Sequence, residues 1–494
     1  MFLAWLSVAL FMIPATQDAQ LSPTAETRLV VSGADAGVDD AASRQLQNEL
    51  GVLSVDQTSV GPQIWTLPDD RVQEAFTALQ ASGTVDAVDY AGDDYRTLFI
   101  DVAETFLNPI EHAQLETIKT WPGVEEVRVQ RTRRDGLSAS VLRQGFGRID
   151  GMAAEGAFLL DLPGRPRFLA KGAAVDTASG AMRWRGDVTS PDPLIAPGQT
   201  GDAFLTLNEG IEGSVVVGED LFLFSPLGER GVQTVAHFKV ANLPRDHAAG
   251  SSGGIVPGEG APFVELGAAL PDQPPIISVG IVWTAAAETE ARKWGRHISD
   301  VIQSTIDQTN YGLERSGATF RLELVGSRAI SGSESGNFQT DALALANRSD
   351  RRWDDVHAWR DQTRSDVVIL VRSSIADHCG EAVAINADEG QAFAVVSYFC
   401  TIATHTIPHE IGHLLGGRHI RDNTTTTTPA YARGYLNGED WRTIMVEDGL
   451  CNCGRINHWA NPNVRYQGVA TGVANQNHDL RVMNANAARV AAYR

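Results

Sequence analysis

The sequence predicts a protein of mixed α+β and α/β class, with a small α+β unit, a β-rich unit and a larger α/β unit that ends the chain. Three observations support this prediction. Strand and helix patterns alternate over residues 26–131, strand runs broken by glycine, proline and asparagine fill residues 137–242, and buried strands alternate with helices from Ile276 onward. The length of 494 residues allows two to four domains.

The first residues of the chain, 1–19, have the pattern of a signal peptide. An apolar stretch from Phe2 to Ile13 is too short to span a bilayer and is followed by proline and small residues, so cleavage is expected near Ala15 or Ala19. An N-terminal membrane anchor or a buried helix is the alternative. No later stretch reaches membrane-spanning length, so we expect a product that is secreted to the extracellular space or the periplasm.

The overall charge of the chain argues against two classes of partner. Lys and Arg number 40 and Asp and Glu number 61, which gives a net charge of −21. A protein this acidic is a poor match for nucleic acid or for an anionic membrane surface. The one basic run, Arg131, Arg133 and Arg134, is too short to change this, although it offers a possible processing site.

The expected α+β unit covers residues 20–136. Strands near 26–33, 63–68 and 85–92 surround a helix over 69–83. A shorter series of the same kind follows: a strand over 96–103, a helix that begins at Pro109 and stops before Gly123, and a strand over 124–131.

The expected β-rich unit covers residues 137–242. Its strand runs, 201–210, 213–226 and 233–242, are separated by turn residues, which predicts a mostly antiparallel arrangement. Residues 243–275 are rich in glycine, proline, alanine and serine, and we interpret them as a linker.

The last unit, residues 276–494, begins with the buried strand "IISVGIVWT" and a helix whose apolar residues recur at helical spacing from Ile298 to Ile306. The elements expected after these are strands over 319–326, 366–372 and 392–398, helices over 339–360 and up to 417, and a closing helix over 484–494.

The stretch "HEIGHLLGGRH", residues 409–419, places ligand side chains at helical spacing. His409 and His413 are four residues apart, so both face one side of a helix and can bind one metal ion at the zinc–nitrogen distance of about 2.0–2.1 Å. Glu410 is rotated away from that side. It can reach a water at the metal and take its proton while the water attacks a carbonyl.

A third ligand requires the chain to turn back after the helix. Gly416 can adopt the left-handed conformation that ends a helix, which lets His419 return to the metal. Three protein ligands leave a fourth position open, and this arrangement is typical of a catalytic zinc site. His405 as a fourth ligand, and a second metal site made by Cys451, Cys453 and His458, are the less favoured alternatives.

The pattern HExxHxxGxxH at 409–419 resembles the zinc signature of the metzincin metallopeptidases. Met445, in "WRTIMVED", resembles the methionine that metzincins place in a tight turn beneath the metal. Cys379-Gly380 and the later Cys400 resemble the reprolysin-like secreted bacterial type, which includes the peptidyl-Asp metallopeptidases. The resemblance covers about 276–494.

The resemblance implies a fold and an activity. It implies a catalytic domain with a mixed twisted sheet and an active-site helix, one catalytic zinc ion, protein or peptide substrates, and an edge strand near 392–398 that pairs with substrate. The sequence does not show whether the protein needs calcium, and it does not determine the oligomeric state. Residues 20–242 would be a propeptide, removed by a cut within 243–275 or, as a second choice, after Arg134. Permanent N-terminal domains, or a zinc-binding adhesion module without activity, are the alternatives.

The same resemblance bears on the cysteines and on one N-terminal motif. The cysteines, Cys379, Cys400, Cys451 and Cys453, form an even set behind a signal peptide, which suggests disulfides but allows three pairings. The resemblance implies that Cys379 pairs with Cys400, which leaves the other two to each other or to a partner. Trp184–Asp187 resembles the aspartate-switch motif of astacin propeptides, although we interpret it as a strand end.

Overall fold

The computed structural model describes the chain in segments. They are residues 26–32, 54–57, 63–68, 87–90, 99–121, 123–132, 155–165, 168–176, 182–189, 200–207, 211–228, 232–245, 260–263, 273–373, 378–420 and 427–494. The expected signal peptide, the helix predicted over 69–83 and most of the 243–275 stretch lie outside them. Within the described residues, no helix combines the length and the hydrophobicity needed to cross a bilayer.

The C-terminal unit is built on a five-stranded sheet with the order β15-β14-β16-β18-β17. Four strands are parallel and β17 is antiparallel at the edge. Their bounds are Ile276–Thr284 for β14, Arg321–Ile330 for β15, Val367–Arg372 for β16, Gly380–Ala382 for β17 and Phe393–Ser397 for β18. The prediction that the strand near 392–398 lies at the edge of the sheet was therefore wrong, because β18 lies between β16 and the short β17.

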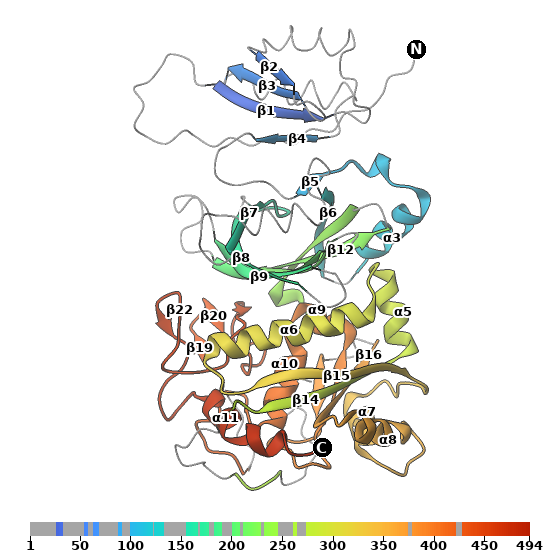
Figure 1. Cartoon of the computed structure of the whole chain (residues 1–494), viewed down its shortest axis with the longest axis vertical. Helices are drawn as coiled ribbons and strands as arrows, with labels where there is room; N and C mark the ends of the chain where they lie inside the picture. The colour runs from blue at the N-terminus through green and yellow to red at the C-terminus, as the bar shows by residue number, and fades with distance from the viewer. Residues whose placement is uncertain are drawn as a thin grey trace.

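Different helices cover the two faces of this sheet, since alternate residues of a strand point to opposite sides. On β16, Ile369 belongs to the hydrophobic cluster that includes α6, α10 and α11, whereas Leu370 belongs to the cluster with α7 and α8 (Figure 1). The helices are α5 (Ala285–Lys293), α6 (Ile298–Ser316), α7 (Phe338–Ala346), α8 (Asp355–Thr363), α9 (Tyr398–Ala403), α10 (Thr406–Leu414) and α11 (Asp479–Val490).

The single helix predicted over 339–360 is two helices, so that prediction was wrong. Helix α7 ends at Ala346 and α8 begins at Asp355. Between them, Arg351 and Trp353 have φ angles of 69° and 64°, in the left-handed region that a helix cannot continue through. The Trp353 side chain is buried in the cluster beneath the sheet, which holds this turn in place.

Two further sheets precede this unit. One has four strands in the order β2-β3-β1-β4, and the other has nine in the order β5-β6-β13-β12-β11-β10-β9-β8-β7, all neighbours antiparallel. The first four strands are Glu26–Ser32, Ser54–Gln57, Gln63–Pro68 and Ala87–Tyr90. The nine, in chain order, are Phe99–Asp101, Val124–Thr132, Glu155–Leu160, Phe168–Asp176, Met182–Thr189, Thr200–Leu207, Ile211–Val217, Asp220–Leu227 and Val232–Lys239.

The nine-stranded sheet crosses the boundary that the sequence suggested near residue 136. Strands β5 and β6 come before that boundary, yet β6 pairs with β13, with Arg131 beside Val232. Helix α3 (Pro109–Lys119) begins where its proline predicts, after the cap residue Asn108, whose side chain accepts from the backbone N–H of Glu111 at 3.0 Å.

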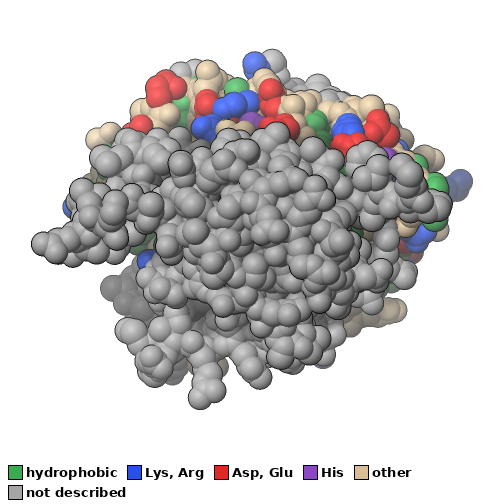
Figure 2. Space-filling model, turned by 90° about the horizontal axis from the view of Figure 1, so that it is seen from above, with side chains coloured by type: hydrophobic (Ala, Val, Ile, Leu, Met, Phe, Trp, Pro, Cys, Tyr) green, Lys and Arg blue, Asp and Glu red, His purple; other side chains and the backbone are tan. Residues whose placement is uncertain are grey.

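Short strands complete the C-terminal unit: β19 (Leu436–Asn437), β20 (Trp441–Arg442), β21 (Gly454–Arg455), β22 (Arg465–Tyr466) and β23 (Val469–Ala470). Figure 2, which looks onto the N-terminal end, shows acidic and basic side chains interspersed on the described rim of the surface. Of the expected linker, Ala261 is held against the C-terminal unit, because its N–H donates to the carbonyl of Asn386 at 2.8 Å.

Candidate metal centre

The stretch 406–419 folds into a helix and a turn. Pro408 lies in the first turn of α10, where no intrahelical N–H partner is needed, so it does not interrupt the helix. After Leu415 the chain reverses at Gly416, which has a φ of 100°, and the N–H of Gly417 donates to the carbonyl of Gly412 at 2.7 Å. The reversal that Gly416 allows returns His419 toward the helix.

Three buried histidines meet at this turn. Nε2 of His419 lies 3.0 Å from Nε2 of His409 and 3.1 Å from Nε2 of His413. Ligand nitrogens of a tetrahedral zinc site are separated by about 3.3 Å, so this spacing fits one metal ion. Across the part of the chain that the structure describes, these three are the one group of three or more His, Cys, Asp or Glu side chains placed to share a metal.

The backbone fixes how two of these imidazoles are protonated. Nδ1 of His409 donates to the carbonyl of Ile444 at 2.7 Å, and Nδ1 of His413 donates to the carbonyl of Gly417 at 2.9 Å. A carbonyl can only accept, so the proton resides on Nδ1 and the lone pair of Nε2 is available to a metal. No pattern in the sequence indicates these carbonyl partners.

Met445 lies directly beneath the helix. Its side chain is fully buried, and a β-carbon added at Gly412 would be 2.4 Å from its sulfur. Gly412, between the two helical histidines, therefore leaves the space that the methionine fills. The preceding residue, Ile444, is the one whose carbonyl accepts from His409. The turn that contains Met445 thus supports the metal-facing side of α10.

Glu410 lies against the edge strand. Its side chain is fully buried, and a β-carbon added at Gly380 of β17 would lie 2.6 Å from its Oε1. The carboxylate therefore occupies the place where β17 carries no side chain. This brings an acid–base group together with a strand edge on which an extended peptide can add.

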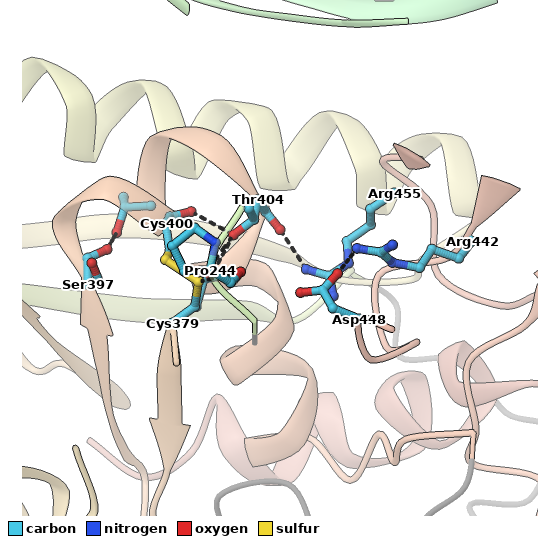
Figure 3. The surroundings of a disulfide bond; sticks show 10 residues. Pro244, Cys379, Ser397, Cys400, Thr404, Arg442, Asp448 and Arg455 are labelled. Carbon is cyan, nitrogen blue, oxygen red and sulfur yellow. Dashed lines mark hydrogen bonds and ion pairs between the residues drawn. A yellow bond between two sulfur atoms is a disulfide. The ribbon is translucent and has the colours of Figure 1, made fainter. Parts of the chain in front are cut away.

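The four cysteines form two disulfides. Cys379, the residue before β17, is joined to Cys400 of α9 (Figure 3). Cys451 is joined to Cys453. The first disulfide ties the edge strand to the helix that precedes α10. A metal site that uses Cys451 and Cys453 is not formed, since metal ligation requires free thiolates.

Arg455, which no sequence pattern indicates, connects these parts. The Arg455 guanidinium donates to the carbonyl of Thr404 at 2.6 Å and to the carbonyl of Val446 at 3.0 Å. It therefore links the chain just before α10 to the turn just after Met445 (Figure 3). Nearby, Arg442 is ion-paired with Asp448.

Two alternative assignments find no support here. His405 is the residue at the N-terminal cap of α10, with a φ of 56°, and does not belong to the three-histidine group. Asp187 lies on β9 and pairs with Arg315 of α6 at 3.0 Å, which places it in a contact between the nine-stranded sheet and α6. Burial raises the pKa of the Asp187 carboxyl, and Arg315 opposes this rise.

Comparisons with known proteins point to metallopeptidases. The Reprolysin_5 family model, described as metallo-peptidase family M12, matches residues 279–458. A Peptidyl-Asp metalloendopeptidase of Stenotrophomonas maltophilia strain R551-3 is 32% identical over 329 residues, which is 64% of this chain and 78% of the relative. The protein of the same name from strain K279a has the same identity and coverage.

A third relative of that name, from Xanthomonas campestris pv. campestris, is 31% identical over 288 residues, 58% of this chain and 67% of the relative. One solved structure, titled "Structure of a chaperone-substrate complex", has a TM-score of 0.36 and 21% identity over 44% of this chain and 36% of that chain. A score this low establishes no shared fold.

Proposed function

The chain belongs to metallo-peptidase family M12 and is a zinc metalloendopeptidase, and from this premise we propose that its three clustered histidines hold the zinc ion and that Glu410 is the general base. The observation that carries the proposal is the Nε2 spacing of 3.0 and 3.1 Å around His419. The two Nδ1–H donations to backbone carbonyls support it, because they present Nε2 to the metal.

Zinc bound at these histidines would supply a Lewis acid that makes a water molecule acidic near neutral pH and polarises a peptide carbonyl. Glu410 accepts the proton of the attacking water and gives it to the amine that leaves. Its burial beneath β17 supports this role, because a carboxylate kept from bulk water is held at a fixed position for the transfer.

The proposed substrates are peptide segments that lie along the free edge of β17. A peptide added there would form backbone hydrogen bonds with the strand and pass the Glu410 carboxylate at Gly380. The name of the relatives points to peptides that carry aspartate. Cleavage of a peptide library is the measurement that determines the preference of this chain.

The protein is further proposed to be a secreted or periplasmic precursor. The leader pattern of residues 1–19 supports export, and the composition of residues 243–275 supports a maturation cut there. Within that stretch the N–H of Ala261 donates to the carbonyl of Asn386, so residues 260–263 are held in place and are a poorer target for the cut.

Replacement of Glu410 by glutamine tests the proposed chemistry. The variant keeps shape and volume, so zinc content should be unchanged while proteolysis falls about a hundredfold. Glu323→Gln, at an exposed position of β15, is the matched control and should keep both. Full chelator-sensitive activity in Glu410→Gln would refute the role of Glu410. A mature protein that held zinc yet cut nothing in a broad peptide library would favour the binding-module alternative.

A further inference from the structure

The nine-stranded sheet and the C-terminal unit share one hydrophobic core. A single buried cluster contains side chains of α3, β12 and β13 together with side chains of α6 and α9. Packed against this cluster, the partly buried Trp121 ring lies 4.4 Å from the Trp294 ring and 4.6 Å from the Phe399 ring, measured between centroids. Trp294 is fully buried. A shared core of this kind is what neighbouring elements of one domain have, not what loosely joined domains have.

The two backbones approach each other closely at two glycines of the C-terminal unit. A β-carbon at Gly295, whose φ is 67°, would lie 2.1 Å from the carbonyl oxygen of Pro226. A β-carbon at Gly454 would lie 2.1 Å from the carbonyl oxygen of Gly218. Any other residue would separate the surfaces, so the C-terminal sequence is adapted to this contact.

A buried ion pair joins the same two units. Arg315 of α6 donates to Asp202 of β10 at 2.6 Å and lies 3.0 Å from Asp187 of β9. Asp202 is only 5% exposed, so its carboxylate depends on Arg315 for compensation. Further pairs between α6 and β9 are Asp307 with Arg183 and Glu314 with Arg185.

Arg296, between α5 and α6, is likewise directed into the sheet. It is 3% exposed, and its guanidinium donates to the carbonyls of Phe224 and Gly213 and to the hydroxyl of Ser225. These three acceptors lie on β11 and β12. A charged side chain that is buried is stable only where its donors are satisfied, and here the sheet satisfies them.

The three histidines lie outside the surface of the C-terminal unit that contacts the nine-stranded sheet. The contacts above come from α5, α6 and α9 and from the strand that contains Gly454, whereas the histidines come from α10 and the turn after it. Figure 1 shows the nine-stranded sheet beside α5, α6 and α9.

We infer that the nine-stranded sheet stays bound to the metallopeptidase domain after the chain is cut. This inference rests on the proposed maturation cut. It also covers the second candidate cut, after Arg134, because β5 and β6 would remain paired to β13. The partner of the surface formed by α5, α6 and α9 is thus residues 99–245 of the same chain.

The inference is tested by cutting the full-length chain at a chosen place. A recognition sequence for a specific protease is inserted in the stretch 250–254, and the cut protein is run on size exclusion at physiological salt. Both fragments should elute together at the mass of the uncut chain. Elution of the metallopeptidase fragment alone would overturn the inference. Co-elution is decided without an activity assay, so a bound but inactive complex would count only against the proposed function.

Two variants identify the interface. Arg315→Ala leaves Asp202 uncompensated and should raise the dissociation constant of the cut fragments by about tenfold or more. Its control is Arg292→Ala. This change removes an exposed ion pair between Arg292 and Glu288, which both lie on α5.

Gly454→Val should act in the same direction through the backbone contact with Gly218. Its control is Gly390→Val, where a β-carbon would meet only the Asp388 carboxylate, at 3.4 Å. If Arg315→Ala and Gly454→Val separate no more readily than their controls, the assigned interface is wrong.

Discussion

Oε1 of Glu410 lies where a β-carbon of residue 380 would be only 2.6 Å away, so the edge strand and the buried carboxylate fit together because residue 380 is glycine. The same β-carbon would be 2.7 Å from Cγ2 of Thr406, at the start of α10. Gly380 is therefore a positioning residue for Glu410 as well as a member of the Cys-Gly pair noted in the sequence.

Replacing Gly380 by alanine should move Glu410 without removing it. We expect proteolysis to fall by about tenfold to a hundredfold, mainly in kcat, while zinc content is unchanged, because displacement of a reacting group costs rate more than binding. Gly390→Ala is the control. Kinetics with a peptide substrate, beside metal analysis, would contradict the prediction if kcat were unchanged.

The three-histidine site should lose its metal when one ligand is removed. His413→Ala is expected to lose both zinc and activity, because two imidazoles bind zinc far more weakly than three. His405→Ala is the comparison, since His405 lies outside the cluster and should keep zinc. Metal analysis of folded protein tests this prediction. The ligand set would need revision if His413→Ala kept its zinc and His405→Ala lost it.

The disulfide between Cys379 and Cys400 should stabilise the fold. It closes a loop with a sequence separation of 21, which predicts a contribution of roughly 3 kcal/mol to the free energy of unfolding. The Cys451–Cys453 bond spans a separation of 2 and should contribute less. Denaturation of the two double-serine variants compares them. Non-reducing peptide mapping that linked Cys379 to Cys451 or Cys453 would exclude this pairing.

Acid should destabilise the protein partly through His458. Burial and, to a smaller extent, the nearby positive charge of Arg315 lower the pKa of His458 to about 4, against the opposing effect of Asp202. The folded state therefore favours the neutral ring. The contribution of the neutral His458 ring to the free energy of unfolding is complete above about pH 6.5. It is lost as pH falls through 4, and the total loss is roughly 3 kcal/mol.

The variant that checks this is His458→Gln, with His112→Gln on α3 as the control. Between pH 7 and pH 4 the free energy of unfolding of His458→Gln should fall less than that of the unmodified protein. Equal pH dependence in the two proteins would show that the histidine does not carry the effect.

Maturation should leave a new N-terminus between residues 243 and 275, with a cut after Arg134 as the second choice. The contact of Ala261 with Asn386 makes residues 260–263 a less favoured position for the cut. N-terminal sequencing and mass spectrometry of the secreted, active form measure this directly. An active product that was still one uncut chain from near residue 20 would rule out the propeptide assignment.

Much of the metal centre could be predicted because its information is local. His409, Glu410 and His413 lie within one helix, and the positive φ of Gly416 follows from the same short stretch. The carbonyl of Ile444 and the guanidinium of Arg455 could not be predicted, since they reach the site from distant positions and neither residue type indicates such a role by itself.

The errors in the fold have a similar cause. Strand β17 has three residues, too few to show any alternation, so the longer apolar run at β18 was mistaken for the edge. The pairing of β6 with β13 depends on segments far apart in the sequence. Local patterns report which residues are strands, but they do not report which strands become neighbours.

The strand order of the nine-stranded sheet sets a demand on protein synthesis. Strands β5 and β6 leave the ribosome before their partner β13, and β7 to β12 are made in between. The hairpins from β7 to β12 pair with close neighbours in the chain, whereas β6 must wait. A chain that lacked β5 and β6 would leave β13 with an open row of backbone donors and acceptors, on which further molecules can add and aggregate. By pairing with β13, strands β5 and β6 thus remove an edge at which newly made chains would aggregate.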